Sequence, residues 1–381
     1  MKTKSLNIAM LGHKHMLSRE GGIEVVVYEL VRRMSQRGHS ITVYDRGENN
    51  VADGKTEEKK CELHGVKIVP VWTMEKKGLA ALTSSFSAAL KVAFSLVDVV
   101  HIHAEGPAAV CAFVKLIGRL RGKKTKVVVT IHGLDWQRAK WGRLASTYIK
   151  FGEKQAVKYA DEIIVLSCGI QEYFARTYGR KTVFIPNGVT VPEIKEPVEI
   201  KKQWGLEKDS FVLFLGRIVP EKGLRYLVEA WKSVKTEKKL VICGGSSDTA
   251  DFMDELKNLA AADERIIFTG FRQGRILEEL FSNSYIYCLP SDLEGMPLSL
   301  LEAMSYGNCC LVSDIQECVE VVEDKAAIFA HSSVFSLRSK LQELLDNEQL
   351  VEVYKAGAAE FICRKYKWDD VVDRTLELYV S

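Results

Sequence analysis

The stretch that best indicates the fold is Phe211-Val-Leu-Phe-Leu-Gly216-Arg217-Ile-Val-Pro-Glu-Lys222-Gly223. It begins with five consecutive apolar residues, turns at a glycine, and is followed by a run with helical spacing. An uninterrupted apolar run of this length is typical of a strand in a parallel sheet that is covered on both faces. Two cations, Arg217 and Lys222, follow the strand beside the start of the predicted helix. This placement suits a diphosphate group, although two surface cations in a loop would give the same pattern.

The same alternation of strand and helix extends in both directions from this stretch. One predicted helix, Ile23–Arg37, places its apolar residues on one face. The other predicted strands are Asn7–Gly12, Ile41–Tyr44, Val66–Val71, Val97–Ile102, Lys126–Ile131, Glu162–Leu166, Thr182–Ile185, Leu240–Cys243, Arg265–Thr269, Tyr285–Leu289 and Cys309–Ser313.

The alternation of predicted strands and helices is interrupted at the turn signal Pro186-Asn187-Gly188. We therefore predict an α/β protein with two facing Rossmann-like domains, each a doubly wound parallel sheet. The predicted boundaries are residues 1–187 and 188–363, and a final helix in 364–381 is expected to cross back to the first domain. Ligands of such sheets bind beyond the carboxyl ends of the strands, so we expect the two ligand sites to share one cleft.

A second motif follows a later strand: Pro290-Ser-Asp-Leu-Glu294-Gly-Met-Pro297, continuing to Glu302. If a helix begins near Pro297, Glu294 lies in the loop before it and Glu302 lies inside it. Both carboxylates could then face one ligand and accept hydrogen bonds from its hydroxyl groups. Two surface glutamates at this spacing are common by chance, but the matching basic site makes chance the weaker explanation.

Composition and charge restrict the class of protein. The 381 residues are 47% hydrophobic and 27% charged, which is typical of a globular protein with two cores. No run is long and apolar enough for a membrane span or a signal peptide, and the nine scattered cysteines show no zinc spacing. We therefore expect a cytoplasmic protein with reduced thiols.

The charge is distributed unevenly. Residues 1–187 carry 30 Lys and Arg against 17 Asp and Glu, whereas residues 188–381 carry 23 against 33. The first half therefore has a net charge of +13, which favours an anionic partner. We interpret this partner as the anionic inner face of a membrane, because no nucleic-acid recognition motif accompanies the charge. The apolar stripe of the predicted helix Leu79–Leu96 could enter such an interface or pack on the sheet.

Taken together, these motifs resemble those of the family-4 retaining glycosyltransferases of the GT-B fold, of the bacterial polysaccharide and glycolipid type. The resemblance covers nearly the whole chain, from Gly21-Gly22 to the closing segment Trp368…Tyr379, and includes Pro186-Asn187-Gly188-Val189. It implies that a sugar moves from a nucleotide diphosphate, by default a UDP-sugar, to a glycan or lipid-linked glycan. It also implies retention of anomeric configuration and no metal or other cofactor, because Arg217 and Lys222 replace the charge of a metal and no Asp-x-Asp occurs.

The resemblance also implies roles for individual residues. Arg217 and Lys222 would hold the diphosphate, Glu294 the donor sugar and Glu302 the ribose, while Gly22 would lie near the phosphates and His132 near the reacting centre. The predicted catalytic residues are Arg217, Lys222, Glu294 and His132, and the predicted donor site contains Gly22, Arg217, Lys222, Glu294, Gly295, Met296, Pro297, Leu298 and Glu302. The predicted acceptor site contains His103, Asp135, Trp136 and Arg138. Of His101 and His103 we expect only one to face the ligand, and we favour His103.

Two observations keep alternatives open. The segment Asp314–Glu320 lacks the Gly-Gly-x-x-Glu pattern of the family, which leaves the identity of the donor undecided. The opening segment Gly12…Gly21-Gly22-Ile23-Glu24 also resembles bacterial rhamnosyltransferases, so an inverting enzyme that uses a dTDP-sugar is one alternative. A non-catalytic subunit that only binds a sugar nucleotide is the other.

Overall fold

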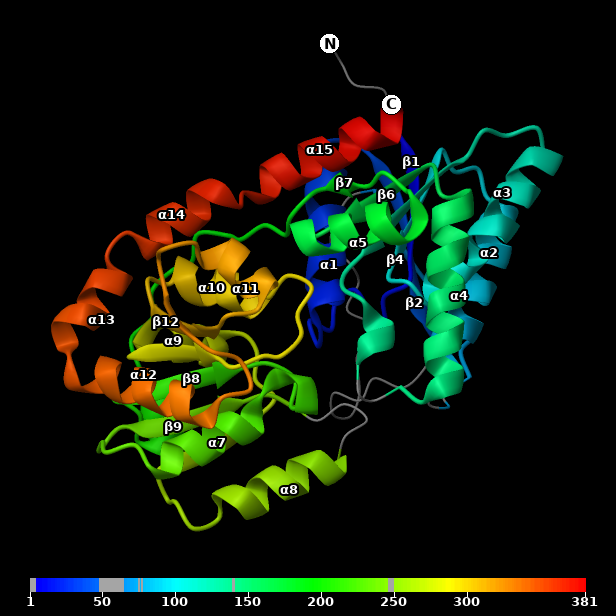
Figure 1. Cartoon of the computed structure of the whole chain (residues 1–381). Helices are drawn as coiled ribbons and strands as arrows, with labels where there is room; N and C mark the ends of the chain where they lie inside the picture. The colour runs from blue at the N-terminus through cyan, green and yellow to red at the C-terminus, as the bar shows by residue number, and fades with distance from the viewer. Residues whose placement is uncertain (1–4, 48–64, 75, 77, 139–140, 246–249) are drawn as a thin grey trace. The chain divides into compact units, whose positions relative to one another are not determined.

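The structure is a computed structural model that describes residues 5–47, 65–74, 76, 78–138, 141–245 and 250–381. Within these residues the chain separates into two compact units (Figure 1). The first unit is Met1–Asn187 together with Trp368–Ser381, and the second is Gly188–Lys367. No helix in the described part of the chain is long and apolar enough to cross a membrane.

The first unit is built on a parallel sheet whose described strands lie in the order β3-β2-β1-β4-β5-β6-β7. The strands are β1 (Asn7–Leu11), β2 (Ser40–Arg46), β3 (Val66–Val71), β4 (Val99–His103), β5 (Lys126–Ile131), β6 (Glu162–Val165) and β7 (Val183–Phe184). The helices are α1 (Gly22–Gln36), α2 (Ala80–Ala93), α3 (Cys111–Leu120), α4 (Arg143–Tyr159), α5 (Cys168–Tyr178) and α15 (Trp368–Val380), with short 3₁₀ turns η1 (Pro107–Val110) and η2 (Asp135–Gln137).

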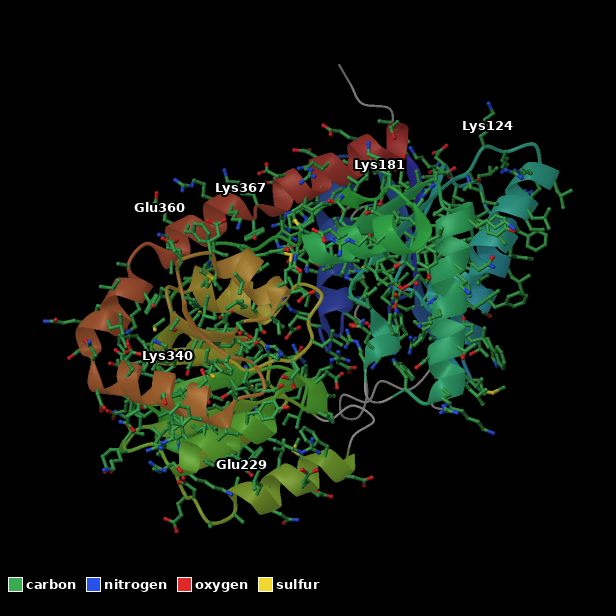
Figure 2. The ribbon with its side chains drawn as sticks, in the orientation of Figure 1. Lys124, Lys181, Glu229, Lys340, Glu360 and Lys367 are labelled. Atoms are coloured by element: carbon green, nitrogen blue, oxygen red, sulfur yellow. The ribbon has the colours of Figure 1, made fainter. Side chains whose placement is uncertain are left out.

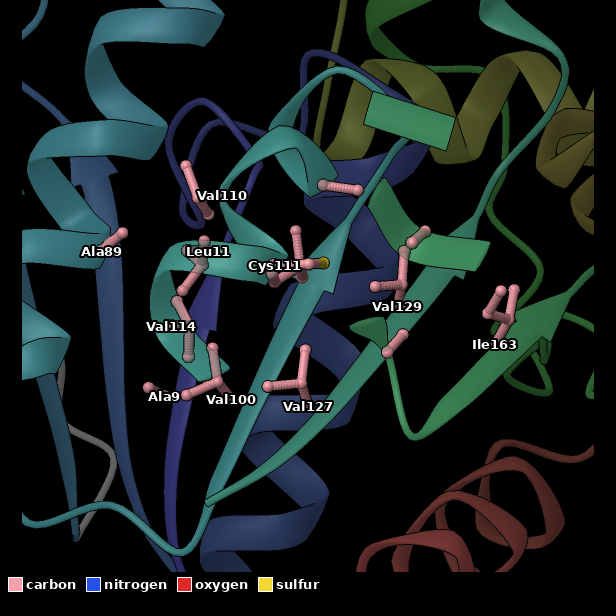
Figure 3. Packing of buried hydrophobic residues seen from close by; sticks show 14 of the residues in the cluster. Ala9, Leu11, Ala89, Val100, Val110, Cys111, Val114, Val127, Val129 and Ile163 are labelled. Carbon is pink, nitrogen blue, oxygen red and sulfur yellow. The ribbon is translucent and has the colours of Figure 1, made fainter. Parts of the chain in front are cut away.

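The core of this unit explains why its strands are continuous apolar runs in the sequence. Val127 and Val129 of β5 lie beside Val100 of β4 and Ile163 of β6 (Figure 3). All four side chains are fully buried, because helices cover both faces of the sheet. The last helix, α15, packs on α1, where Arg37 bonds to the carboxylates of Asp369 and Asp373.

The second unit repeats the plan, with described strands in the order β10-β9-β8-β11-β12-β13. The strands are β8 (Phe211–Leu215), β9 (Lys239–Cys243), β10 (Ile266–Gly270), β11 (Ile286–Leu289), β12 (Cys309–Ser313) and β13 (Ala327–Phe329). The helices are α6 (Glu199–Trp204), α7 (Leu224–Lys232), α8 (Ala250–Ala260), α9 (Arg275–Asn283), α10 (Leu298–Ser305), α11 (Gln316–Val322), α12 (Val334–Asp346), α13 (Glu348–Lys355) and α14 (Ala358–Lys365), with the 3₁₀ turn η3 (Pro220–Lys222).

The predicted fold, two doubly wound parallel sheets of the Rossmann type, is confirmed. Among the described strands, only the short β13 was not expected from the sequence, because three residues are too few to form a recognisable pattern. In each sheet the order of strands reverses at one place, between β1 and β4 in the first and between β8 and β11 in the second. These reversals are the positions where open α/β sheets bind ligands.

Candidate functional site

The predicted donor residues of the second unit gather at its strand reversal. Gly216 and Arg217 follow β8, and the segment Pro290–Pro297 follows its neighbour β11. The two segments are tied together, since the amide of Asp292 donates to the carbonyl of Glu221 at 2.9 Å. Gly223 permits this approach: its φ is +68°, and a Cβ there would lie 1.8 Å from the carbonyl oxygen of Pro290.

An ion pair forms the centre of this arrangement. The Lys222 ammonium lies 2.5 Å from Oε1 of Glu294, and both side chains are largely buried, with exposures of 13% and 9%. The same carboxylate oxygen accepts a 2.7 Å hydrogen bond from the Ser291 hydroxyl. Ser313 at the end of β12 in turn donates to the carbonyl of Ser291. The carboxylate is therefore held by Lys222 and Ser291, and Ser313 of β12 anchors the backbone of Ser291.

The other predicted donor residues of the second unit lie on the segments that follow β8 and β11. Pro297 is the N-cap of α10, Leu298 is its first residue, and Glu302 lies within this helix. Gly295 and Met296 are buried, whereas Arg217 and Glu302 are partly exposed. Gly22 is the one predicted donor residue outside the second unit, because it begins α1 in the first unit.

Sequence reasoning missed one carboxylate in this region. Glu317 lies in the first turn of α11, and burial, with smaller contributions from Glu320 and Glu294, raises its pKa. The next residue, Cys318, is fully buried, and the charges of Glu294 and Lys222 both act electrostatically on its thiol. The signal was present in the sequence, because Glu317 follows an apolar strand just as Glu294 does.

In the first unit, histidines cluster where β1, β4 and β5 end. Nδ1 of His103 lies 3.0 Å from Nε2 of His132, and Nε2 of His13 lies 2.8 Å from the carboxylate of Asp45. Burial lowers the pKa of His132 to about 4 and holds that of His103 well below its ordinary value. Both imidazoles are therefore neutral near pH 7 and can donate or accept a hydrogen bond without carrying charge. His13 was not predicted, although it lies only two residues beyond the end of β1.

We expected His101 and His103 to alternate along the strand, so that only one faces the ligand, but the two side chains do not alternate. Residues two apart in a strand share a face, and the two rings stack with centroids 4.2 Å apart. His101 is nevertheless held away from the strand end by Tyr379 at 2.6 Å and Thr130 at 2.7 Å. His103 alone of the two contacts His132.

The predicted acceptor segment is η2 and the residues around it. The carboxylate of Asp135 accepts from Nε of Arg138 at 2.7 Å, and both side chains are partly exposed. The ring of Trp136 is covered on one side by the ammonium of Lys150, 3.8 Å from its centroid. Glu24, near the start of α1, is buried, accepts from the amide of Lys14 and acts electrostatically on His132; sequence reasoning assigned it no role.

Two families of known proteins match successive parts of the chain. Residues 20–191 match the family described as Glycosyltransferase Family 4. Residues 198–361 match the family described as Glycosyl transferases group 1. The two matches follow one another along the chain and cover most of it.

Several curated proteins are similar at low identity. N-acetyl-alpha-D-glucosaminyl L-malate synthase of Bacillus anthracis is 24% identical over 94% of this chain and 93% of its own length. UDP-Gal:alpha-D-GlcNAc-diphosphoundecaprenol alpha-1,3-galactosyltransferase of Escherichia coli is 27% identical over 74% of this chain and 75% of its own. An uncharacterized glycosyltransferase of Methanocaldococcus jannaschii, MJ1607, is 25% identical, and the match spans 57% of this chain and only 59% of that protein.

Solved structures share the fold. Sucrose-phosphate synthase from Thermosynechococcus elongatus superposes with a TM-score of 0.80 at 19% identity, covering 99% of this chain and 98% of that one. Anabaena Alr3699/HepE, solved in complex with UDP and glucose, gives 0.81 at 16% identity, covering 98% and 99%. At these identities the likeness shows the fold alone.

Proposed function

The chain is a glycosyltransferase of the GT-B fold with a family-4 first half and a group 1 second half, and we propose that it transfers a hexose from a UDP-sugar to a lipid-linked glycan. The transfer retains the anomeric configuration and uses no metal ion. The observation that carries this proposal is the buried Lys222–Glu294 pair beside Arg217 at the strand reversal of the second unit.

The chemistry of the donor supports these roles. Cleavage of the anomeric C–O bond leaves negative charge on the departing diphosphate, and fixed cations that meet this charge lower the barrier. Arg217 and Lys222 supply two such cations at one strand end, so no metal ion is required to neutralise the leaving group. Glu294, oriented by Ser291, accepts hydrogen bonds from hydroxyl groups of the donor sugar.

The names of the relatives support the choice of donor and the stereochemistry. The synthase of Bacillus anthracis and the galactosyltransferase of Escherichia coli are both named for α-linked products, and the latter uses UDP-galactose and a diphosphoundecaprenol acceptor. Because the sugar in UDP-hexose donors is α-linked, an α-linked product means retention. In the mechanism we propose, a departing phosphate oxygen takes the proton of the acceptor hydroxyl on the face where the new bond forms.

The outer surface of the first unit supports a membrane-bound acceptor. Several exposed apolar side chains lie on α2, on α3 and just beyond α2: Phe86, Leu90, Phe94, Leu96, Leu116 and Leu120. Arg119, Arg121 and Lys124 are exposed at the end of α3, and Figure 2 shows Lys124 projecting outward there. Apolar residues flanked by cations suit an anionic lipid surface, and we propose that this face, the α2–α3 face, docks on the inner leaflet.

The proposal is tested with purified protein, UDP-hexoses and N-acetylglucosaminyl-diphosphoundecaprenol. Thermal stabilisation by UDP-sugars in the presence of EDTA, together with formation of an α-linked disaccharide lipid, supports it. A β-linked product would establish the inverting alternative. Donor binding without transfer to any lipid-linked or free glycan would indicate a non-catalytic subunit.

A further inference from the structure

Two carboxyl groups that take no part in the proposed sugar chemistry lie side by side inside the first unit. Glu105 follows β4 and Glu153 lies within α4, and neither residue is exposed to solvent. The helix comes close to the backbone of Glu105 because residue 152 is glycine: a Cβ at Gly152 would lie 2.0 Å from the Glu105 carbonyl oxygen. The two glutamates are therefore fixed against each other by the packing of α4.

Each carboxyl group has partners on one oxygen only. Oε2 of Glu105 accepts from the amide of Asp135 at 2.7 Å. Oε1 of Glu153 accepts from the hydroxyl of Tyr173 at 2.9 Å and from that of Tyr178. The other oxygens, Oε1 of Glu105 and Oε2 of Glu153, are buried and meet no amide, hydroxyl or ammonium donor in the part of the chain that the structure describes. The two carboxyl groups lie within hydrogen-bonding reach of each other.

One proton between the two carboxyl groups gives each of the remaining oxygens a hydrogen-bond partner. Two ionised carboxylates in contact away from water repel each other strongly, and neither glutamate forms a salt bridge within the described residues. The nearest charges face the pair from the η2 side, where Asp135 is bonded to Arg138. Burial raises the pKa of Glu105, and the hydrogen bond with Glu153 and the charge of Asp135 raise it further.

The position of the proton follows from the partners. Glu153 accepts two hydroxyl donors, which stabilise an ionised carboxylate. Glu105 accepts one backbone amide and also faces the Asp135 carboxylate, which disfavours a second negative charge. The neutral carboxylic acid is therefore on Glu105 and the negative charge on Glu153.

We propose that Glu105 and Glu153 share one proton carried by Glu105, and that this carboxylic acid positions the acceptor segment Asp135–Gln137. The bond from the Asp135 amide fixes the first residue of η2, and through it the Asp135 side chain and the Trp136 ring. Glu105 is thus a positioning residue that acts through Asp135. The part concerning the acceptor rests on the proposed function, whereas the shared proton does not.

Two substitutions at one site separate the roles of shape and hydrogen bonding. Glu105→Gln keeps an acceptor for the Asp135 amide and offers an N–H to Glu153, so we expect the wild-type acceptor KM. Glu105→Leu removes both bonds, and we expect the acceptor KM to rise about tenfold, the effect of one lost hydrogen bond. Binding of UDP, measured calorimetrically, should be unchanged in both. Glu172→Gln, an exposed glutamate on α5 paired with Arg176, is the matched control.

A spectroscopic measurement tests the proton without requiring activity. The wild-type infrared spectrum near pH 7 should contain the carbonyl stretch of a buried carboxylic acid, and Glu105→Gln should lack it while Glu172→Gln retains it. Persistence of the band in Glu105→Gln, or failure of this variant to fold, would overturn the shared proton. An acceptor KM that is equal in the Leu and Gln variants would overturn the positioning role. If the wild type transfers no sugar, the proposed function fails. The infrared result still decides whether Glu105 and Glu153 share a proton.

Discussion

The ammonium of Lys222 and the carboxylate of Glu294 neutralise each other at 2.5 Å between the segments that follow β8 and β11, and neither side chain is more than 13% exposed. Each side chain therefore balances the charge of the other. In the function we propose, a donor diphosphate that approaches Lys222 offers it a second anion, and Glu294 accepts hydrogen bonds from the hydroxyl groups of the sugar. The proposal therefore couples binding of the diphosphate and recognition of the sugar in one pair of residues.

This coupling predicts different effects on activity and stability. Lys222→Ala should lower kcat by about 10²- to 10³-fold, comparable to the removal of one oxyanion donor. It should also lower the melting temperature, because Glu294 loses the partner of its buried charge. Adding Glu294→Gln should restore the melting temperature but not kcat. Restoration of both in the double variant would contradict the assignment of Lys222 to the leaving group.

The proposed charge neutralisation by Arg217 and Lys222 predicts the effect of removing metal ions. Transfer rates measured after dialysis against EDTA should equal those measured with added Mg²⁺ or Mn²⁺. Arg217→Gln should then weaken UDP binding by about tenfold or more, since a hydrogen bond to a charged group contributes about 1.5–3 kcal/mol. Activity that is lost with EDTA and recovered only with a divalent ion would overturn the metal-free mechanism.

Much of this arrangement could be predicted from the sequence, because strand ends are visible as apolar runs that stop at polar residues. Arg217, Glu294 and His132 each follow such a run, and the fold then brings those of one sheet to one edge. The side-chain pairings could not be predicted. The bond between Lys222 and Glu294 joins positions 72 residues apart, and the stacking of His101 on His103 depends on Tyr379 of the last helix. Glu105 and Glu153 looked like ordinary charged residues, since nothing in the sequence showed that both are buried.

The histidine cluster predicts a loss of stability in acid. Burial lowers the pKa of His101 to about 3 and that of His132 to about 4, whereas unfolded histidines titrate near 6.5. Below that value the unfolded chain binds more protons than the native chain, so the free energy of unfolding decreases as the pH falls. With His103 included, the contribution of the three histidines to this slope should approach about 4 kcal/mol per pH unit, from which the proton held by Glu105 subtracts about 1.4 kcal/mol per pH unit. Urea unfolding between about pH 7 and about pH 5 measures it.

The control for this slope is His101→Gln, whose amide can still bond to Tyr379 and Thr130. It removes one titrating group and should make the slope shallower by about 1.4 kcal/mol per pH unit. An unchanged slope would show that His101 is protonated equally in the folded and unfolded chain.

The α2–α3 face predicts a selective effect on membrane binding. Phe94→Asp places a negative charge on the most exposed residue of this face, whose side chain is 80% exposed, and should reduce sedimentation with anionic phosphatidylglycerol vesicles several-fold. Phe335→Asp, on α12 of the acidic second unit and 75% exposed, is the matched control. Transfer to a short water-soluble acceptor should be unaffected in both. Equal binding of the two variants would exclude this face as the docking surface.

The shared proton of Glu105 and Glu153 predicts a loss of stability with rising pH. Because burial raises the pKa of Glu105, the native chain keeps a proton that an unfolded glutamate releases above about pH 4.5. Above that value the native state binds more protons, so the free energy of unfolding should fall by about 1.4 kcal/mol for each pH unit. Between about pH 7 and pH 8 the histidines are mostly neutral in both states, and their contribution is the same in the wild type and the variant. Glu105→Gln holds the same hydrogen bonds without a proton, and its slope over this range should be shallower than that of the wild type by this amount. Parallel slopes would mean that both carboxyl groups are ionised in the folded protein.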